Sequence, residues 1–120
     1  MSTKKQEALG THILLEFHGC PTEAITSSDK VEKIFLKAAE ISKAHIVETV
    51  FHHFNPHGVS GVVVISESHF AVHTWPEHKF VAIDLFSCSK DLDMEKAIEY
   101  LKKRLSPKTV SVLKLDRGIL

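Results

Sequence analysis

The feature that most constrains the fold of this chain is a run of four strand-like segments between two helix-like segments. Each of the four is rich in β-branched and aromatic side chains or alternates apolar with polar positions, which is typical of β-strands. The run consists of residues 45–54, 61–66, 69–75 and 79–89. Residues 29–43 precede it with apolar side chains at helical spacing, and the stretch from Asp91 to Leu105 follows with the same spacing. We expect Asp29 and Asp91 to cap the two helices.

Each end of the chain adds one more strand. Residues 11–20 alternate apolar with polar side chains, and residues 109–115, with the sequence TVSVLKL, form the final predicted strand. The order of elements is therefore β-α-β-β-β-β-α-β. Because the helices are separated by a run of strands, the predicted fold class is α+β. We expect a two-layer sandwich in which a mainly antiparallel sheet carries both helices on one face.

The composition is that of an ordinary globular chain with a single domain, residues 1–120. Hydrophobic residues make up 43% and charged residues 25% of the chain. The formal net charge is zero and no basic run is present, so neither nucleic acid nor an anionic membrane is an expected partner. No apolar stretch approaches the roughly 20 residues that span a bilayer, and the first ten residues contain no signal-peptide core. We therefore expect a cytoplasmic protein.

Nine histidines and two cysteines raise the alternative of a metal-binding module. Cys20 and Cys88 make no zinc framework, and neither an H-E-x-x-H motif nor a pair of C-x-x-C motifs is present. His69 and His73 are four residues apart on one predicted strand, roughly 13 Å, which is too far to share a metal ion. The remaining candidate ligands are His52, His53, His57 and His78. We expect no metal site, and we interpret Cys20 as a small buried apolar side chain.

One face of the predicted sheet carries side chains that are unusual for a surface in water. On the strand of residues 69–75, alternation places Phe70, Val72 and Thr74 on the core side. The opposite side carries His69, Ala71, His73 and Trp75, together with Asp84, Phe86 and Cys88 from the next strand. A solvated face favours Lys, Glu and Thr, so we expect a ligand, a second subunit or both to cover this one. A homodimer or higher homo-oligomer is the predicted assembly.

Three short motifs and a cysteine occur in order within residues 58–88. A Ser after a Glu at a strand break is by itself typical of a turn, and no G-x-S-x-G elbow is present. The ordered set is more specific than any one motif. It consists of G-V-S-G at 58–61, E-S-H at 67–69, H-T-W-P-E at 73–77, and Cys88. This set, with the opening GTHILLEFHGC, resembles the processing site of the small bacterial and archaeal S-adenosylmethionine decarboxylase proenzymes.

The resemblance implies that the chain cleaves itself between Glu67 and Ser68, giving chains 1–67 and 68–120. In that family the Ser68 hydroxyl attacks the Glu67 carbonyl, and Ser60 supports the tetrahedral intermediate by hydrogen bonding. His73 matches the base that removes the Cα proton of residue 68. The expected product is a covalent pyruvoyl cofactor generated from Ser68.

The same resemblance implies decarboxylation of S-adenosylmethionine, which gives CO₂ and an aminopropyl donor for spermidine and polyamine biosynthesis. The pyruvoyl carbonyl forms a Schiff base with the substrate amine and acts as an electron sink, and Cys88 matches the proton donor. A sulfonium cation and an adenine ring both favour aromatic faces, so Phe54 and Trp75 are candidate substrate contacts. Glu77 is the candidate for polar contacts. The expected partners are S-adenosylmethionine and the two cleavage chains.

A pyruvoyl-dependent arginine decarboxylase on the same fold is the alternative function. Members with that activity mature in the same way and differ in the substrate pocket, so the cleavage motif does not discriminate between them. Here His78-Lys79-Phe80 follows H-T-W-P-E, where an aromatic residue and a glycine are often found in the decarboxylases of S-adenosylmethionine. Both substrates stay open at this point.

Overall fold

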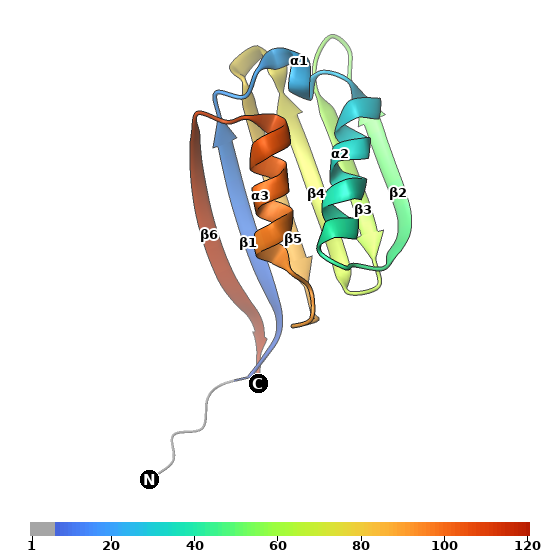
Figure 1. The fold of residues 1–120 in the computed structure, drawn as a ribbon, viewed down its shortest axis with the longest axis vertical. Coiled ribbons are helices and arrows are strands. Elements are labelled where there is room, and N and C mark those ends of the chain that lie inside the picture. The colour runs from blue at the N-terminus through green and yellow to red at the C-terminus, as the bar shows by residue number, and fades with distance from the viewer. Residues whose placement is uncertain (1–6) are drawn as a thin grey trace.

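The structure, a computed structural model, describes residues 7–120 and consists of one six-stranded antiparallel sheet with helices against one face (Figure 1). The strands are β1 (Ala8–His18), β2 (Ile46–His53), β3 (Val59–Ile65), β4 (Ser68–Trp75), β5 (Phe80–Ser87) and β6 (Thr109–Ile119). The helices are α1 (Thr22–Ile25), α2 (Ser28–Ile41), the 3₁₀ turn η1 (Pro76–His78) and α3 (Met94–Leu105). The predicted α+β sandwich with both long helices on one side is confirmed. Residues 1–6 of the predicted domain lie outside the described residues.

The strand order is β2-β3-β4-β5-β1-β6, so β1 enters the sheet between β5 and β6 (Figure 1). Strands β2 to β5 follow one another along the chain and across the sheet, each antiparallel to its neighbour. The largest fully buried side chains lie between the sheet and the helices; they include Phe17, Phe35, Phe70, Leu85 and Leu101. The interior strands that carry the predicted site are thereby fixed by a core on one face only.

The helix starts differ in detail from the sequence-based expectation. The cap of α2 is Ser27, not Asp29, because the Ser27 hydroxyl accepts a hydrogen bond from the Lys30 amide at 3.3 Å. The cap of α3 is Asp93, not Asp91, and its carboxylate accepts from an amide in the first turn at 3.1 Å. The short helices α1 and η1 were not predicted, since a single turn has too few residues to show a periodic pattern.

A buried hydroxyl on β4 joins the sheet to the last residue of α1. Thr74 Oγ1 donates to the Ile25 carbonyl at 2.9 Å and accepts from the Val59 amide at 3.0 Å. Thr74→Val keeps the shape of the side chain but leaves both backbone groups buried without a partner, so we expect a loss of about 1–3 kcal/mol in the free energy of unfolding. Urea unfolding measures it. Thr109→Val at an exposed position is the matched control, and an equal effect of the two substitutions would contradict this role.

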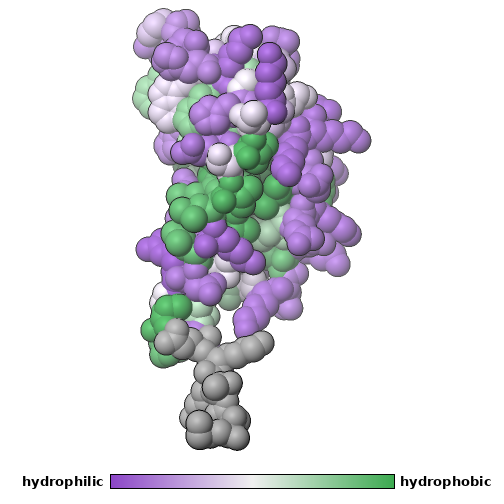
Figure 2. Space-filling view, turned by 90° about the vertical axis from the view of Figure 1, so that its left-hand side faces the viewer, coloured by the Kyte–Doolittle hydropathy of each residue, from purple (hydrophilic) through white to green (hydrophobic). Residues whose placement is uncertain are grey.

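The face of the sheet away from the helices, called the open face here, is covered by no element among residues 7–120 (Figure 1). As predicted, Phe70, Val72 and Thr74 are buried, whereas His73 and Trp75 are exposed. Strand β6 adds exposed apolar side chains, and Figure 2, which views the molecule from the β6 edge of the sheet, shows hydrophobic surface in the middle of that edge. Leu113 and Leu115 lie on the open face, because they pair with Leu14 and His12 of β1, whereas exposed Val112 pairs with the core residue Leu15 and lies on the helix side. No helix among the described residues is long and apolar enough to cross a membrane.

Candidate active site

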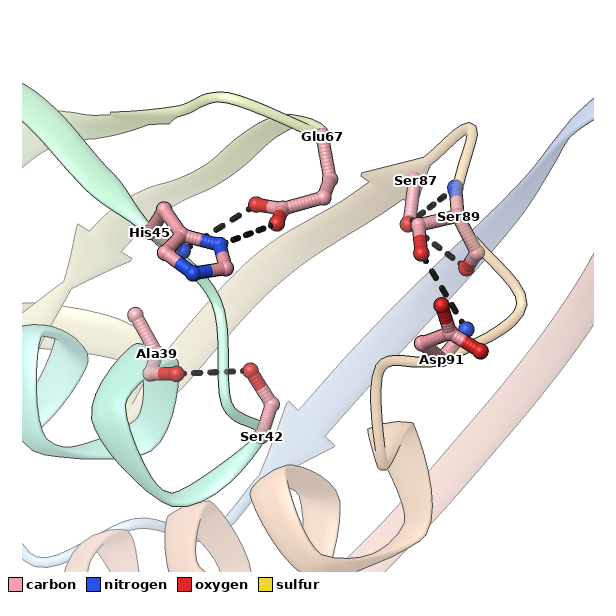
Figure 3. Close-up of polar contacts among 7 residues, drawn as sticks. All are labelled: Ala39, Ser42, His45, Glu67, Ser87, Ser89 and Asp91. Atoms are coloured by element: carbon pink, nitrogen blue, oxygen red, sulfur yellow. Dashed lines mark hydrogen bonds and ion pairs between the residues drawn. The ribbon is translucent and has the colours of Figure 1, made fainter.

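The predicted cleavage site lies in the tight turn between β3 and β4. Glu67 is the last residue of this turn and Ser68 is the first of β4. The Glu67 carboxylate is held by His45: Oε2 lies 2.7 Å from Nδ1, and Oε1 accepts from the backbone amide at 3.1 Å (Figure 3). The hydrogen bond to the His45 ring lowers the pKa of the Glu67 carboxyl. The side chain before the scissile bond is therefore fixed.

The backbone around this bond combines strain with a polarising hydrogen bond. Ser68 has a backbone φ of +147°. Residues other than glycine rarely adopt this conformation, which costs roughly 1–3 kcal/mol. The Glu67 carbonyl oxygen accepts a hydrogen bond from the Cys88 amide at 2.8 Å. An amide at that oxygen stabilises the negative charge that develops when a nucleophile adds to the carbonyl. This arrangement favours attack on the Glu67–Ser68 peptide bond.

Cys88 is placed beside the scissile bond by the register of β4 and β5. Ser68 pairs with Ser87, so the next residue, Cys88, reaches the turn that contains Glu67. Cys88 is a free and exposed thiol, and it lines a cavity of about 920 Å³ near the start of β1 and the ends of β5 and β6. Cys20 is also free, but it is buried, and burial raises the pKa of its thiol to about 11. Only Cys88 is thus accessible next to the cleavage site.

Ser60 and His73 form a second group on the open face. They face each other across β3 and β4, and Ser60 Oγ lies 2.8 Å from His73 Nδ1. The Trp75 ring is 6.3 Å from the His73 ring, centroid to centroid. Phe54, just past the end of β2, lies against His52 at 4.4 Å. Glu77 is exposed in η1, directly after β4. The predicted processing and substrate-binding residues thus fall into two sets: Glu67 and Ser68 belong to the β3–β4 turn, and the others belong to this second group.

The two groups lie at opposite ends of the same strand. We call Glu67, Ser68 and Cys88 the cleavage half-site, and Phe54, Ser60, His73, Trp75 and Glu77 the histidine half-site. Ser68 and His73 are five residues apart on β4, roughly 17 Å at the rise of an extended strand. The His73 imidazole therefore cannot reach the Ser68 Cα proton of its own chain. One chain holds both halves of the predicted site without bringing them together.

Sequence reasoning missed a polar cluster in the middle of the open face. His12 Nε2 lies 3.1 Å from Asp84 Oδ1, and Arg117 Nη1 lies 3.4 Å from His12 Nδ1. His69 packs nearby against Phe86; burial lowers the pKa of the His69 imidazole, and positive charge on His12 adds to this. Alternation had placed Asp84 on this face, but its partners come from distant parts of the chain. Within residues 7–120, no three His, Cys, Asp or Glu side chains are grouped to hold a metal ion.

Sequence reasoning also missed His45. The strand predicted over residues 45–54 begins at His45, but β2 begins at Ile46, so His45 lies in the connection between α2 and β2. Its contact with Glu67 depends on how that connection folds against the β3–β4 turn, which local sequence does not specify.

Comparison with known proteins identifies the family of this chain. The family described as S-adenosylmethionine decarboxylase matches residues 11–118. The S-adenosylmethionine decarboxylase proenzyme of Thermotoga petrophila is 49% identical over 112 residues, covering 93% of this chain and 86% of that protein. The proenzyme of Moorella thermoacetica is 45% identical over 113 residues, covering 94% and 90%. The crystal structure of the adenosylmethionine decarboxylase from Aquifex aeolicus superposes with a TM-score of 0.89 at 29% identity, covering 95% and 94%. The predicted relationship is confirmed: this chain belongs to the S-adenosylmethionine decarboxylase family.

Proposed function

We propose that this chain is a self-cleaving proenzyme whose mature form decarboxylates S-adenosylmethionine to the aminopropyl donor of polyamine biosynthesis. The family match supports S-adenosylmethionine over arginine as the substrate. The observation that carries the self-cleavage is the Glu67–Ser68 peptide bond, which has a strained residue on one side and the Cys88 amide on its carbonyl oxygen.

Cleavage begins at the Glu67 carbonyl carbon, which the Ser68 hydroxyl attacks while the Cys88 amide stabilises the oxygen. The C–N bond then breaks, the hydroxyl proton passes to the freed nitrogen, and the amide becomes an ester. Removal of the Ser68 Cα proton by His73 of a second copy of the chain expels the ester as the Glu67 carboxylate and leaves a dehydroalanine. Water replaces its nitrogen, releases ammonia, and leaves a pyruvoyl group at the start of chain 68–120.

The residues around Ser68 fit a pyruvoyl group at this position. Such a group would supply an electron-withdrawing carbonyl, which is the electron sink that decarboxylation of an amino-acid substrate needs. The Cys88 thiol lies beside the turn and lines the cavity, so it can return a proton to the substrate. The cavity offers about 920 Å³ for that substrate.

The separation of the half-sites leads us to assign a homodimer in which the open faces of two copies pack together. An antiparallel, two-fold arrangement places the cleavage half-site of one copy opposite the histidine half-site of the other, and creates two equal sites. The exposed apolar side chains support this packing, since Leu113 is 57% and Trp75 41% exposed in one copy. Phe54, Trp75 and Glu77 then reach the substrate from the second copy, with aromatic faces suited to the sulfonium and the adenine.

The purified, unmodified protein tests the proposal directly. Intact mass and a denaturing gel should show chains 1–67 and 68–120, and labelled CO₂ should be released from carboxyl-labelled S-adenosylmethionine but not from arginine. A persistent 13.4 kDa species without a reactive carbonyl would contradict self-cleavage. Release from arginine alone would contradict the substrate.

Cys88→Ala separates the two roles of this residue. Alanine keeps the backbone amide that contacts the Glu67 carbonyl, so we expect cleavage at close to the normal rate. The thiol is lost, so turnover should fall by about 10²-fold or more, as expected for a missing proton donor. A gel measures the first effect and CO₂ release per cleaved chain the second. Unchanged turnover would show that another group donates the proton.

A further inference from the structure

We infer that His45 is a positioning residue for chain cleavage: it holds Glu67 so that the scissile carbonyl stays in place for attack by Ser68. The inference rests on the self-cleavage proposed above and extends it to a residue outside both half-sites.

Three hydrogen bonds join the loop around His45 to the turn before Ser68. Two come from His45 to the Glu67 carboxylate, through Nδ1 at 2.7 Å and the backbone amide at 3.1 Å (Figure 3). The third runs the other way, from the Ser66 amide to the His45 carbonyl at 2.8 Å. The turn is therefore fixed through both its backbone and its one acidic side chain.

Exposure shows how the His45 ring is placed. The Glu67 side chain is only 13% exposed although it lies in a turn, whereas the His45 side chain is 80% exposed. The ring thus lies outside the carboxylate and shields it from water. A hydrogen bond to an ionised carboxylate is stronger than one between neutral groups, and a partly shielded one is stronger still.

Glu67 is consequently held from two directions. Its carboxylate is bound to His45 on one strand connection, and its carbonyl oxygen is bound to the Cys88 amide on another. Together they restrict rotation of the acyl group relative to Ser68, whose own backbone is strained. Restricting a reacting group to its productive orientation accelerates an intramolecular reaction.

The contact between His45 and Glu67 also remains after cleavage. His45 and Glu67 both belong to chain 1–67, so breakage of the bond to Ser68 leaves their contact intact. The new carboxyl terminus at Glu67 is thereby kept in the turn. The contact with the Cys88 amide, by contrast, joins two separate chains after cleavage.

His45→Ala tests the inference in freshly translated full-length protein, with cleavage followed over time on a denaturing gel. Loss of a hydrogen bond to a charged group should slow cleavage about tenfold, because the backbone amide of residue 45 still contacts Glu67. CO₂ release per cleaved chain and the melting temperature should stay close to those of the unmodified protein. His45→Asn, which restores a side-chain donor, should cleave faster than His45→Ala. Lys37→Ala, which removes an exposed ion pair with Glu40 on α2, is the matched control.

A double-mutant cycle shows whether His45 acts through Glu67. Glu67→Gln weakens the same contact, so adding His45→Ala to it should cause little further slowing. Cleavage of His45→Ala at the normal rate would overturn the inference, and so would equal slowing in both backgrounds. Either result, with normal cleavage of the unmodified chain, would leave the proposed function standing. Absence of cleavage in the unmodified chain would overturn both.

Discussion

Replacement of Ser68 by alanine is expected to leave one continuous chain of 120 residues without decarboxylase activity. Without the hydroxyl, no ester can form at the Glu67 carbonyl, and the strain and the Cys88 amide have no nucleophile to act on. No pyruvoyl group then arises, so activity should fall by roughly 10³-fold or more, as when a covalent catalytic group is removed. The fold should persist, because the core lies on the other side of the sheet from this turn.

Intact mass, a denaturing gel and a carbonyl-reactive hydrazide probe together measure this outcome. Ser66→Ala is the matched control, since Ser66 is an exposed serine in the same turn whose contact with His45 is made by its backbone amide. The control should cleave and react with the probe. Cleavage of Ser68→Ala at the normal position would mean that another group attacks the chain.

Mixing two inactive variants is expected to restore activity. In a dimer with shared sites, Ser68→Ala retains a working histidine half-site and His73→Ala retains a working cleavage half-site. A mixed dimer therefore contains one complete site and one site that lacks both groups. Random pairing of equal amounts should recover about a quarter of the unmodified activity, since half of the dimers are mixed and each has one site of two.

Co-expression with two different affinity tags makes this measurable. Only the tagged His73→Ala chain should be cleaved, since it carries Ser68. Mixing the double variant Ser68→Ala/His73→Ala with either single variant is the control, and it should restore nothing. Recovery at the level of that control would show that Ser68 and His73 act within one chain, against the roughly 17 Å that separates them along β4.

Most of the fold follows from periodicity. Alternation in residues 69–75 correctly assigns Phe70 and Val72 to the core and His73 and Trp75 to the open face, because a strand exposes successive side chains on opposite sides. Periodicity does not fix local detail. Asp91 and Asp93 have equal capping chemistry, and only the path of the chain into α3 selects Asp93.

The candidate site is less predictable because it depends on register. The sequence resemblance identifies Ser68 and Cys88, but their proximity requires the pairing of Ser68 with Ser87 across β4 and β5. The contact of His45 with Glu67 requires two connections to fold against each other. The division into half-sites, by contrast, follows from the strand predicted over residues 69–75, which the structure extends back to Ser68.

The placement of the half-sites along β4 has a consequence for the kinetic order of maturation. The base that completes cleavage belongs to another molecule, so a newly made chain at high dilution stays uncleaved. The rate of cleavage rises with protein concentration until all chains are dimeric. Cleavage would then occur only in assembled dimers. A monomeric chain in the cell would carry no pyruvoyl carbonyl, so it could not react with cellular amines.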